Sequence, residues 1–127
     1  MSRKILIIDD SSTVRQQVRS ALNVEFEMLE AADGVEGLQS IDDNADLAAV
    51  ICDVNMPRMG GLEMLEMAKA RGTLAQLPVL MLTTEGQPAL MQRAKAIGAK
   101  GWVVKPFKPE LLLATIRKIA KLEEGSA

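Results

Sequence analysis

The sequence contains no histidine and only one cysteine, Cys52, among its 127 residues. Without histidine, Ser-His and Cys-His nucleophilic catalysis are excluded, and the chain cannot itself carry a phosphohistidine. A single cysteine cannot form an internal disulfide, and zinc sites built from cysteine and histidine lack their ligands. The chemistry of this protein must therefore depend on other side chains.

The sequence also lacks a strong charge of either sign and a long apolar run. Its 15 Lys and Arg nearly balance 17 Asp and Glu, for a net charge of −2, so we expect no nucleic-acid partner. The apolar run near the start covers only residues 5–8, too short for a signal peptide or a membrane span. We expect a cytoplasmic protein with no membrane insertion.

What is present indicates one globular α/β domain, residues 1–127, because 48% of the residues are apolar and 25% are charged. The period of the apolar residues alternates between that of a strand and that of a helix, which gives five strands and five helices. The expected strands cover residues 5–8, 25–31, 47–52, 77–82 and 102–104, and the helices about 14–22, 35–41, 62–72, 88–97 and 109–122. Strands alternating with helices form a doubly wound parallel sheet covered on both faces.

Side chains that carry chemistry follow four of the five expected strands. Asp9 and Asp10 follow the first, Asp53 the third, Thr83 the fourth and Lys105 the fifth. Because the carboxyl ends of parallel strands meet at one edge of the sheet, we expect these side chains to converge. Taken singly, an Asp or Thr at such a position is explained equally well as a helix cap.

The three acids as a set are harder to explain by capping. Two like charges about 4 Å apart repel by about 4 kcal/mol at an effective dielectric constant near 20, so a bound cation would make the arrangement favourable. Oxygen ligands without histidine or cysteine favour Mg²⁺. With the metal present, Asp53 could act as a nucleophile and form an aspartyl-phosphate, while Lys105 and Thr83 could hold a bound anion.

Two other residue types have structural explanations. Cys52 lies inside an expected buried strand, so we expect an unreactive thiol. Eight methionines could indicate a pliable binding groove, but we expect most of them to fill gaps in the core. The methionines expected in the core are Met64, Met67, Met81 and Met91.

Four motifs occur in a fixed order along the chain: IIDD, DVNMPRMGG, LTTE and VVKPF. Together they resemble the receiver domain of bacterial response regulators, over about residues 4–122. The resemblance is to the CheY-like, single-domain chemotaxis branch of that family. It implies a flavodoxin-like (βα)5 fold with the strand order 2-1-3-4-5.

The resemblance also implies roles for the acids. A sensor kinase's phosphohistidine would donate its phosphoryl group to Asp53. Asp10 and Asp53 would bind Mg²⁺ together with the backbone carbonyl of Asn55, and Asp9 would act largely through water.

Further roles follow from the same resemblance. Thr83 and Lys105 would hold the phosphoryl oxygens, and the Lys105–Pro106 peptide bond would be cis. Trp102 stands three residues before the lysine, where the family places its switch aromatic. We expect it beside Thr83 on the neighbouring strand end, although an ordinary core tryptophan is a serious alternative.

The chain matches the family at the two positions that tune hydrolysis of the phosphoryl group, Asn55 and Glu85, and departs from it at two others. Gly60 replaces the usual Asp or Asn, which predicts a more mobile loop after Asp53. Thr84 replaces the common Ala or Gly, which predicts a tighter phosphoryl pocket.

The sequence as a whole indicates a stand-alone, monomeric response regulator of a two-component system in chemotaxis. Its output face would comprise the helix over residues 88–97, the last strand and the last helix. The expected partners are a sensor histidine kinase and either a flagellar motor switch protein or a phosphatase. As an enzyme it would catalyse only its own phosphorylation and dephosphorylation.

Three alternatives remain at this point. The chain could be a phosphorelay carrier or phosphate sink, or a receiver that mediates contacts without phosphorylation. It could also be a flavin- or nucleotide-binding module, which the acids of Asp9-Asp10 disfavour because a phosphate-binding loop would be expected there.

Overall fold

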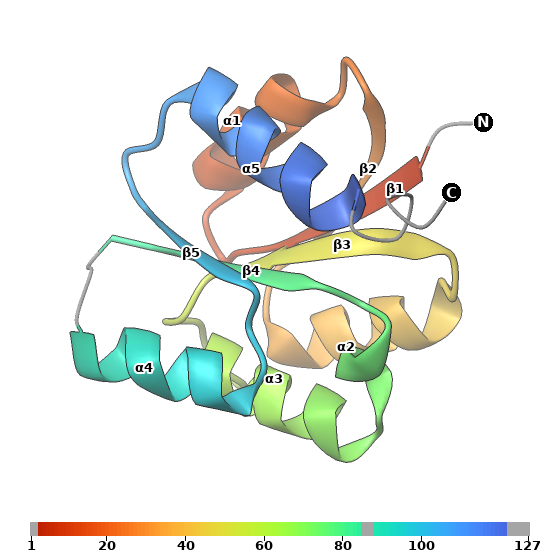
Figure 1. Ribbon diagram of the computed structural model, residues 1–127, viewed down its shortest axis with the longest axis vertical. Helices are drawn as coiled ribbons and strands as arrows, with labels where there is room; N and C mark the ends of the chain where they lie inside the picture. The colour runs from red at the N-terminus through yellow and green to blue at the C-terminus, as the bar shows by residue number, and fades with distance from the viewer. Residues whose placement is uncertain (1–2, 85–87, 122–127) are drawn as a thin grey trace.

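The fold is built on a parallel sheet of five strands in the order β2-β1-β3-β4-β5 (Figure 1). The computed structural model describes residues 3–84 and 88–121. The strands are β1 (Arg3–Ile8), β2 (Phe26–Ala31), β3 (Leu47–Cys52), β4 (Val79–Thr83) and β5 (Gly101–Val104). The strand order and parallel pairing confirm the doubly wound, flavodoxin-like α/β fold predicted above.

The α-helices of the described residues cover both faces of this sheet. α1 (Ser12–Leu22) and α5 (Pro109–Lys121) cover one face. α2 (Gly34–Asp43), α3 (Gly61–Ala70) and α4 (Pro88–Ile97) cover the other (Figure 1). Every helix connects two parallel strands or follows the last one, so the carboxyl ends of the strands all lie along the same edge.

The inner strands are buried on both faces, as their unbroken apolar runs predicted. Along β1, Leu6 and Ile8 contact the core under α2 and α3, whereas Ile5 and Ile7 contact the core under α1 and α5. Successive side chains of a strand point to opposite faces, so a run of apolar residues supplies both cores. Burying each such side chain contributes roughly 1.5–3 kcal/mol, which makes the sheet a rigid base for the residues at its edge.

Two helices begin at capping side chains directly after strands. Ser11 accepts a hydrogen bond from the Val14 N–H at 3.2 Å, and Asp33 accepts one from the Glu36 N–H at 2.9 Å. Each cap satisfies a backbone donor that the first turn leaves without a partner, and so fixes where α1 and α2 start.

The predicted start of the fourth strand, at residue 77, is wrong. β4 begins at Val79, two residues after the predicted start, because Pro78 has no N–H to donate to the sheet. The Pro78 carbonyl still accepts a hydrogen bond from the Val50 N–H at 3.0 Å. A short 3-10 helix, η1 (Thr73–Ala75), lies between α3 and β4 and was not predicted.

Three of the methionines expected in the core are wholly or partly buried there. Met64 and Met81 are fully buried, and Met91 is half-buried. The prediction is wrong for Met67, which is 42% exposed. It lies outside the stripe of α3 that faces the sheet, which is formed by residues 61, 64, 65 and 68.

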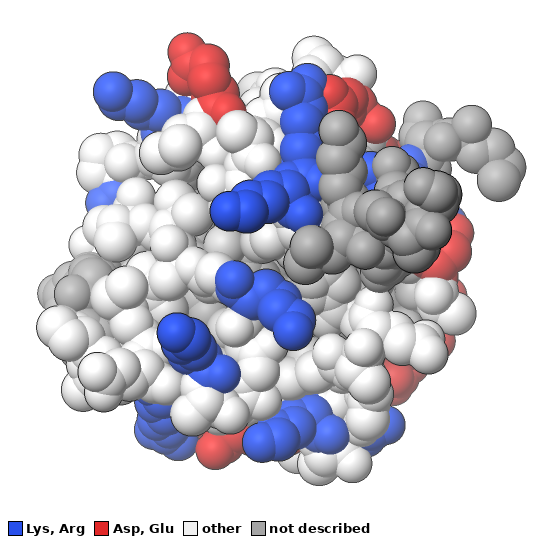
Figure 2. Space-filling view, viewed as in Figure 1, with Lys and Arg blue, Asp and Glu red and all other residues white. Residues whose placement is uncertain are grey.

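Charge is distributed unevenly over the surface. Of the chain's 15 Lys and Arg, eight lie in residues 88–121, together with only one of its 17 Asp and Glu. These residues form α4, β5 and α5, and Figure 2 shows basic side chains over this face with acidic ones mostly at its margin. The face formed by α4, β5 and α5 is therefore basic, although the chain as a whole is slightly acidic.

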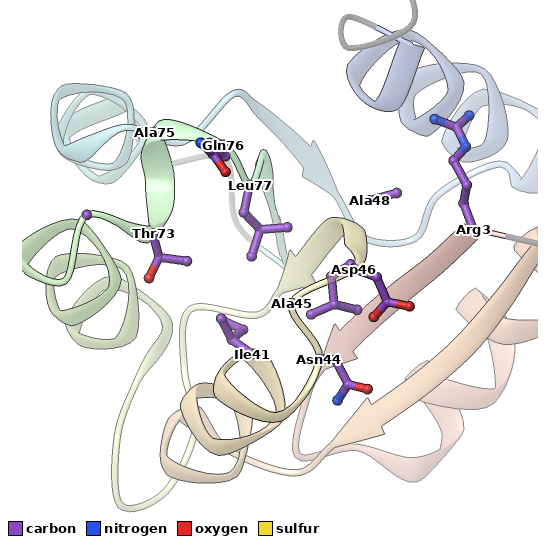
Figure 3. Close-up of a pocket in the computed structure, with 12 residues that line it drawn as sticks. Arg3, Ile41, Asn44, Ala45, Asp46, Ala48, Thr73, Ala75, Gln76 and Leu77 are labelled. Atoms are coloured by element: carbon purple, nitrogen blue, oxygen red, sulfur yellow. The ribbon is translucent and has the colours of Figure 1, made fainter.

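A cavity of about 640 Å³ opens at the amino ends of the strands, between the end of α2 and η1 (Figure 3). Its charged lining residues are Arg3 and Asp46, and Asp46 forms an ion pair with Lys4 at 3.1 Å. The side chains singled out by the sequence lie at the opposite edge of the sheet. Among the described residues, no helix combines the length and apolar character needed to cross a bilayer.

Candidate functional site

The carboxyl edge of the sheet gathers the side chains that the sequence predicted there. Asp9, Asp53 and Thr83 are buried, with exposed fractions of 0%, 6% and 3%, whereas Asp10 is exposed. Lys105 reaches the same place from the end of β5. Residues that are up to 96 positions apart in sequence thus share one site.

The three acids form a cluster in which one carboxylate oxygen from each lies within 4.8 Å of the others. Burial raises the pKa of Asp53, and the nearby charge of Asp9 raises it further, while Lys105 opposes the shift. The same crowding extends to the preceding residue, because burial and then the charges of Asp53 and Asp9 raise the pKa of the Cys52 thiol. A thiol held in its neutral form is unreactive, as was expected for Cys52.

Lys105 is the cation that partly offsets these charges. Its Nζ lies 2.9 Å from Asp9 Oδ2 and 3.6 Å from Asp53 Oδ1. Its backbone N–H donates to the Thr83 carbonyl at 2.6 Å, and the Lys105–Pro106 peptide bond is cis. One ammonium group against three carboxylates leaves the site with two negative charges.

Asp9 is held by contacts that the sequence did not suggest. The Ser11 N–H donates to Asp9 Oδ1 at 2.9 Å, and Arg15 donates from Nη1 to the Asp9 carbonyl at 2.7 Å. Arg15 also pairs with Glu30 at the end of β2, at 3.0 Å. A cation near the start of a helix is disfavoured by the helix dipole, and this was the one signal in the sequence that could have pointed to Arg15.

The loop after Asp53 is fixed at both of its ends. The Val54 N–H donates to Asp53 Oδ1 at 2.8 Å, and the Val54 carbonyl accepts from the Gly61 N–H at 2.9 Å. A Cβ on Gly61 would collide with the Asp53 carbonyl, so this position requires glycine. Between these ends lies Asn55, which is exposed.

Two departures from the family pattern lie beside the site. Gly60 precedes α3, and its N–H donates to Glu63 Oε1 at 3.2 Å. Thr84 is exposed at the end of β4. The expected effects on loop mobility and on the tightness of a phosphoryl pocket stay predictions, and Glu85 lies outside the described residues.

Trp102 was expected beside Thr83 on the neighbouring strand, but it does not lie directly opposite that residue. The register of β4 and β5 pairs Trp102 with Met81 and pairs Val104 with Thr83. Because side chains alternate along a strand, Trp102 and Val104 share a face, and Trp102 lies two residues back from the site. Its indole N–H is buried without a hydrogen-bond partner among the described residues, and the ring lines a hollow of about 470 Å³ beside α4.

Comparison with known proteins shows the family to which this chain belongs. Residues 5–117 match the family model described as the response regulator receiver domain. The chain belongs to this family. It is 40% identical to the chemotaxis protein CheY1 of Helicobacter pylori over 111 residues, which cover 86% of this chain and 90% of that protein.

Solved structures agree with this assignment. The structure of chemotaxis protein CheY4 from Vibrio cholerae matches with a TM-score of 0.86 and 42% identity, over 94% of this chain and 99% of that one. CheY in the CheX-CheY-BeF3-Mg²⁺ complex from Borrelia burgdorferi matches with a TM-score of 0.85 and 25% identity, over 92% and 88% of the two chains. The CheY-like character suggested by the motifs is therefore confirmed.

Members of this family are response regulators of two-component systems, and phosphorylation and Mg²⁺ binding at an acidic pocket are general among them. The residues of this chain fit such an ion. The cluster offers three carboxylates, which are hard oxygen ligands, and its two uncompensated negative charges match one divalent cation. Asp9, Asp10 and Asp53 are the side chains that could hold it.

Replacing Asp53 with Asn is expected to stabilise the metal-free protein at pH 7 by roughly 1 kcal/mol. The substitution removes one crowded carboxylate, while the ion pair between Lys105 and Asp9 is retained. A carboxyl with a raised pKa in the folded state opposes folding above that pKa, and this penalty disappears as the pH falls below its unfolded value. The difference in free energy of unfolding should therefore shrink towards about pH 4.

Urea unfolding in the presence of a chelator measures this difference. Asp42→Asn is the matched control, because Asp42 pairs with Arg71 on the surface, away from the cluster. A D53N protein that is less stable than the unchanged one at pH 7 would contradict the electrostatic account.

Proposed function

We propose that this chain is a stand-alone chemotaxis response regulator that acts in the cytoplasm and accepts a phosphoryl group on Asp53 from the phosphohistidine of a sensor kinase. The observation that carries the proposal is the buried cluster of Asp9 and Asp53 with exposed Asp10 and with Lys105 at 2.9 Å from Asp9. An acceptor, a metal-binding set and a cation for the phosphoryl oxygens are all present at one edge of the sheet. A receiver that has lost phosphorylation would not need this costly arrangement.

In the proposed reaction, a carboxylate oxygen of Asp53 forms the new P–O bond as the P–N bond of the donor breaks and its imidazole leaves. Asp10, Asp53 and the Asn55 backbone carbonyl would hold Mg²⁺, and Asp9 would act through water. The ion supplies charge neutralisation on the transferring group. Lys105, already 3.6 Å from Asp53, would contact a phosphoryl oxygen directly.

The hydroxyl of Thr83 and the ring of Trp102 would carry the signal away from the site. Thr83 is buried beside the acceptor and would donate to a phosphoryl oxygen. Within the described part of the chain, the buried N–H of Trp102 has no hydrogen-bond partner, and such an unpaired group costs roughly 1–3 kcal/mol. A second orientation of the ring, in which this N–H has a partner, would therefore differ little in free energy from the observed one. A switch with a typical coupling of about 1–3 kcal/mol requires two such states.

The face formed by α4, β5 and α5 is the proposed output surface. Lys95, Lys100 and Lys118 are exposed on it, and Val104 and Leu111 add apolar side chains that are 42% and 58% exposed. Basic and apolar groups together favour a partner that presents acidic and apolar side chains. The relatives named above are chemotaxis proteins, which supports a flagellar motor switch protein or a phosphatase as this partner.

The acceptor is tested by incubating the protein with a small phosphodonor and Mg²⁺ and measuring its intact mass. We expect the addition of one phosphoryl group, which Asp53→Asn should abolish because the amide has no carboxylate oxygen with which to attack the phosphorus. Asp42→Asn, on the surface, should retain the added mass. A D53N protein that still gains the phosphoryl group would place the acceptor elsewhere.

The switch is tested by fluorescence, since Trp102 is the only tryptophan. Its emission should change when Mg²⁺ is added together with a beryllofluoride mimic of the phosphoryl group, and hardly at all with Mg²⁺ alone, because the ring is remote from the metal ligands. Thr83→Ala should weaken the response. An equal response to Mg²⁺ alone would refute the role of Trp102.

The output distinguishes a regulator from a relay carrier or phosphate sink, which would use the same chemistry. A regulator should bind its motor or phosphatase partner at least fivefold more tightly with the mimic than without it. Lys95→Glu should reduce that binding, whereas Lys69→Glu on α3 should not. Equal partner binding with and without the mimic would instead favour a carrier or sink.

A further inference from the structure

The loop between β3 and α3, residues 55–60, is tied by a side chain to the start of α2. Arg58 donates from Nε to Asp33 Oδ2 at 2.7 Å, and its Nη2 lies 2.7 Å from the same oxygen and 3.6 Å from Glu36 Oε2. Asp33 is only 4% exposed and also caps α2. A buried carboxylate with a charged partner is a stronger tie than a surface ion pair, because losing the partner leaves the buried charge uncompensated.

A second contact holds the same stretch of the loop. The Gly34 N–H donates to the Met59 carbonyl at 3.0 Å, and a Cβ on Gly34 would lie 2.7 Å from Met59 Cγ. The loop therefore lies directly on the first turn of α2. Glycine at residue 34 is what permits this close approach.

The backbone of Arg58 has an unusual conformation at the point where its side chain contacts α2. Its φ is 63°, in the left-handed region that a residue with a Cβ rarely adopts, and it is the only non-glycine residue with positive φ among those described. Such a conformation persists where surrounding contacts impose it. Here the Met59 N–H donates to the Pro57 carbonyl at 2.6 Å and closes a tight turn around Arg58, and the guanidinium donors on Asp33 hold this turn against α2.

The Arg58–Asp33 pair lies close in sequence to a residue with a proposed function. The loop is fixed at Val54 on one side and at Arg58 and Met59 on the other, so only residues 55–57 lie between the two anchors. Asn55, whose backbone carbonyl is a proposed Mg²⁺ ligand, is one of these three residues.

We propose that Arg58 is a positioning residue, whose ion pair with Asp33 holds the Asn55 segment beside the acidic cluster and thereby sets the affinity of the site for Mg²⁺. This inference rests on the proposed function, because Asn55 is a metal ligand only in that reading. It assigns to α2 a part in metal binding although α2 contributes no ligand.

The test compares Mg²⁺ affinity, measured by titration calorimetry, in the full chain and in variants of the pair. R58G removes the side chain and relieves the left-handed backbone, which offsets part of the cost of leaving the buried Asp33 without its partner, and urea unfolding checks that the variant is folded. D33N keeps a capping side chain on α2 and leaves the loop sequence intact. The control is R71Q, which breaks the Arg71–Asp42 ion pair between α3 and α2 at 2.9 Å.

We expect R58G and D33N each to weaken Mg²⁺ binding by about tenfold, as is typical when a group that orients a metal ligand is lost. The double variant should be little worse than either single one, because both remove the same contact. R58K should retain part of the affinity, and R71Q should retain all of it. Hydrogen exchange of the Gly34 amide should accelerate in R58G and D33N, with or without metal.

Two outcomes separate this inference from the function on which it rests. If the unchanged protein takes up no Mg²⁺, both are wrong. If it binds Mg²⁺ and R58G and D33N bind it equally well, only the role of Arg58 is overturned. Urea unfolding distinguishes a purely structural contact, which would lower stability in D33N without any change in Mg²⁺ affinity.

Discussion

The structure of the site depends on the repulsion among three carboxylates that the sheet brings to one edge. Asp9 and Asp53 are fixed by strands whose side chains are fully buried, so neither can move away from the other without disturbing the core. Lys105 compensates one charge, and its ammonium group lies closer to Asp9 than to Asp53. Asp53 is thus the less compensated of the two buried acids, which is the position in which a bound cation has most to offset.

The fold could be predicted from the sequence because it depends on local patterns. Unbroken apolar runs such as residues 47–52 identify strands buried on both faces, and Ser11 and Asp33 mark the start of helices through hydrogen bonds to residues three positions away. The convergence of Asp9, Asp53, Thr83 and Lys105 also followed, because parallel strands of a doubly wound sheet end at one edge. The assignment of roles within the cluster required the resemblance to receiver domains as well.

What could not be predicted depends on register and on contacts between distant residues. Trp102 was expected beside Thr83, but a shift of two residues in the pairing of β4 with β5 places Val104 there, and no pattern in the sequence fixes that register. Arg58 and Asp33 are 25 positions apart, and their pairing depends on how the loop crosses α2. Arg15 reaches the Asp9 carbonyl for a similar reason, since the direction of a long side chain is set by its neighbours in the folded protein.

The balance of charge at the site constrains how a signal could leave it. Three carboxylates and one ammonium carry a net charge of −2, and one divalent ion would bring this to zero. A phosphoryl group replaces the single negative charge of Asp53 with about two, so the occupied site would differ from the metal-bound site by only about one charge. At physiological ionic strength an exposed charge is screened over about 8 Å. A change this small cannot by itself reorganise the basic face formed by α4, β5 and α5, and so the effect on a partner must pass through contacts. Thr83 and Trp102 lie on adjacent strands, and the buried N–H of the ring has no hydrogen-bond partner among the residues that the structure describes, so these are the two residues that we propose to transmit it.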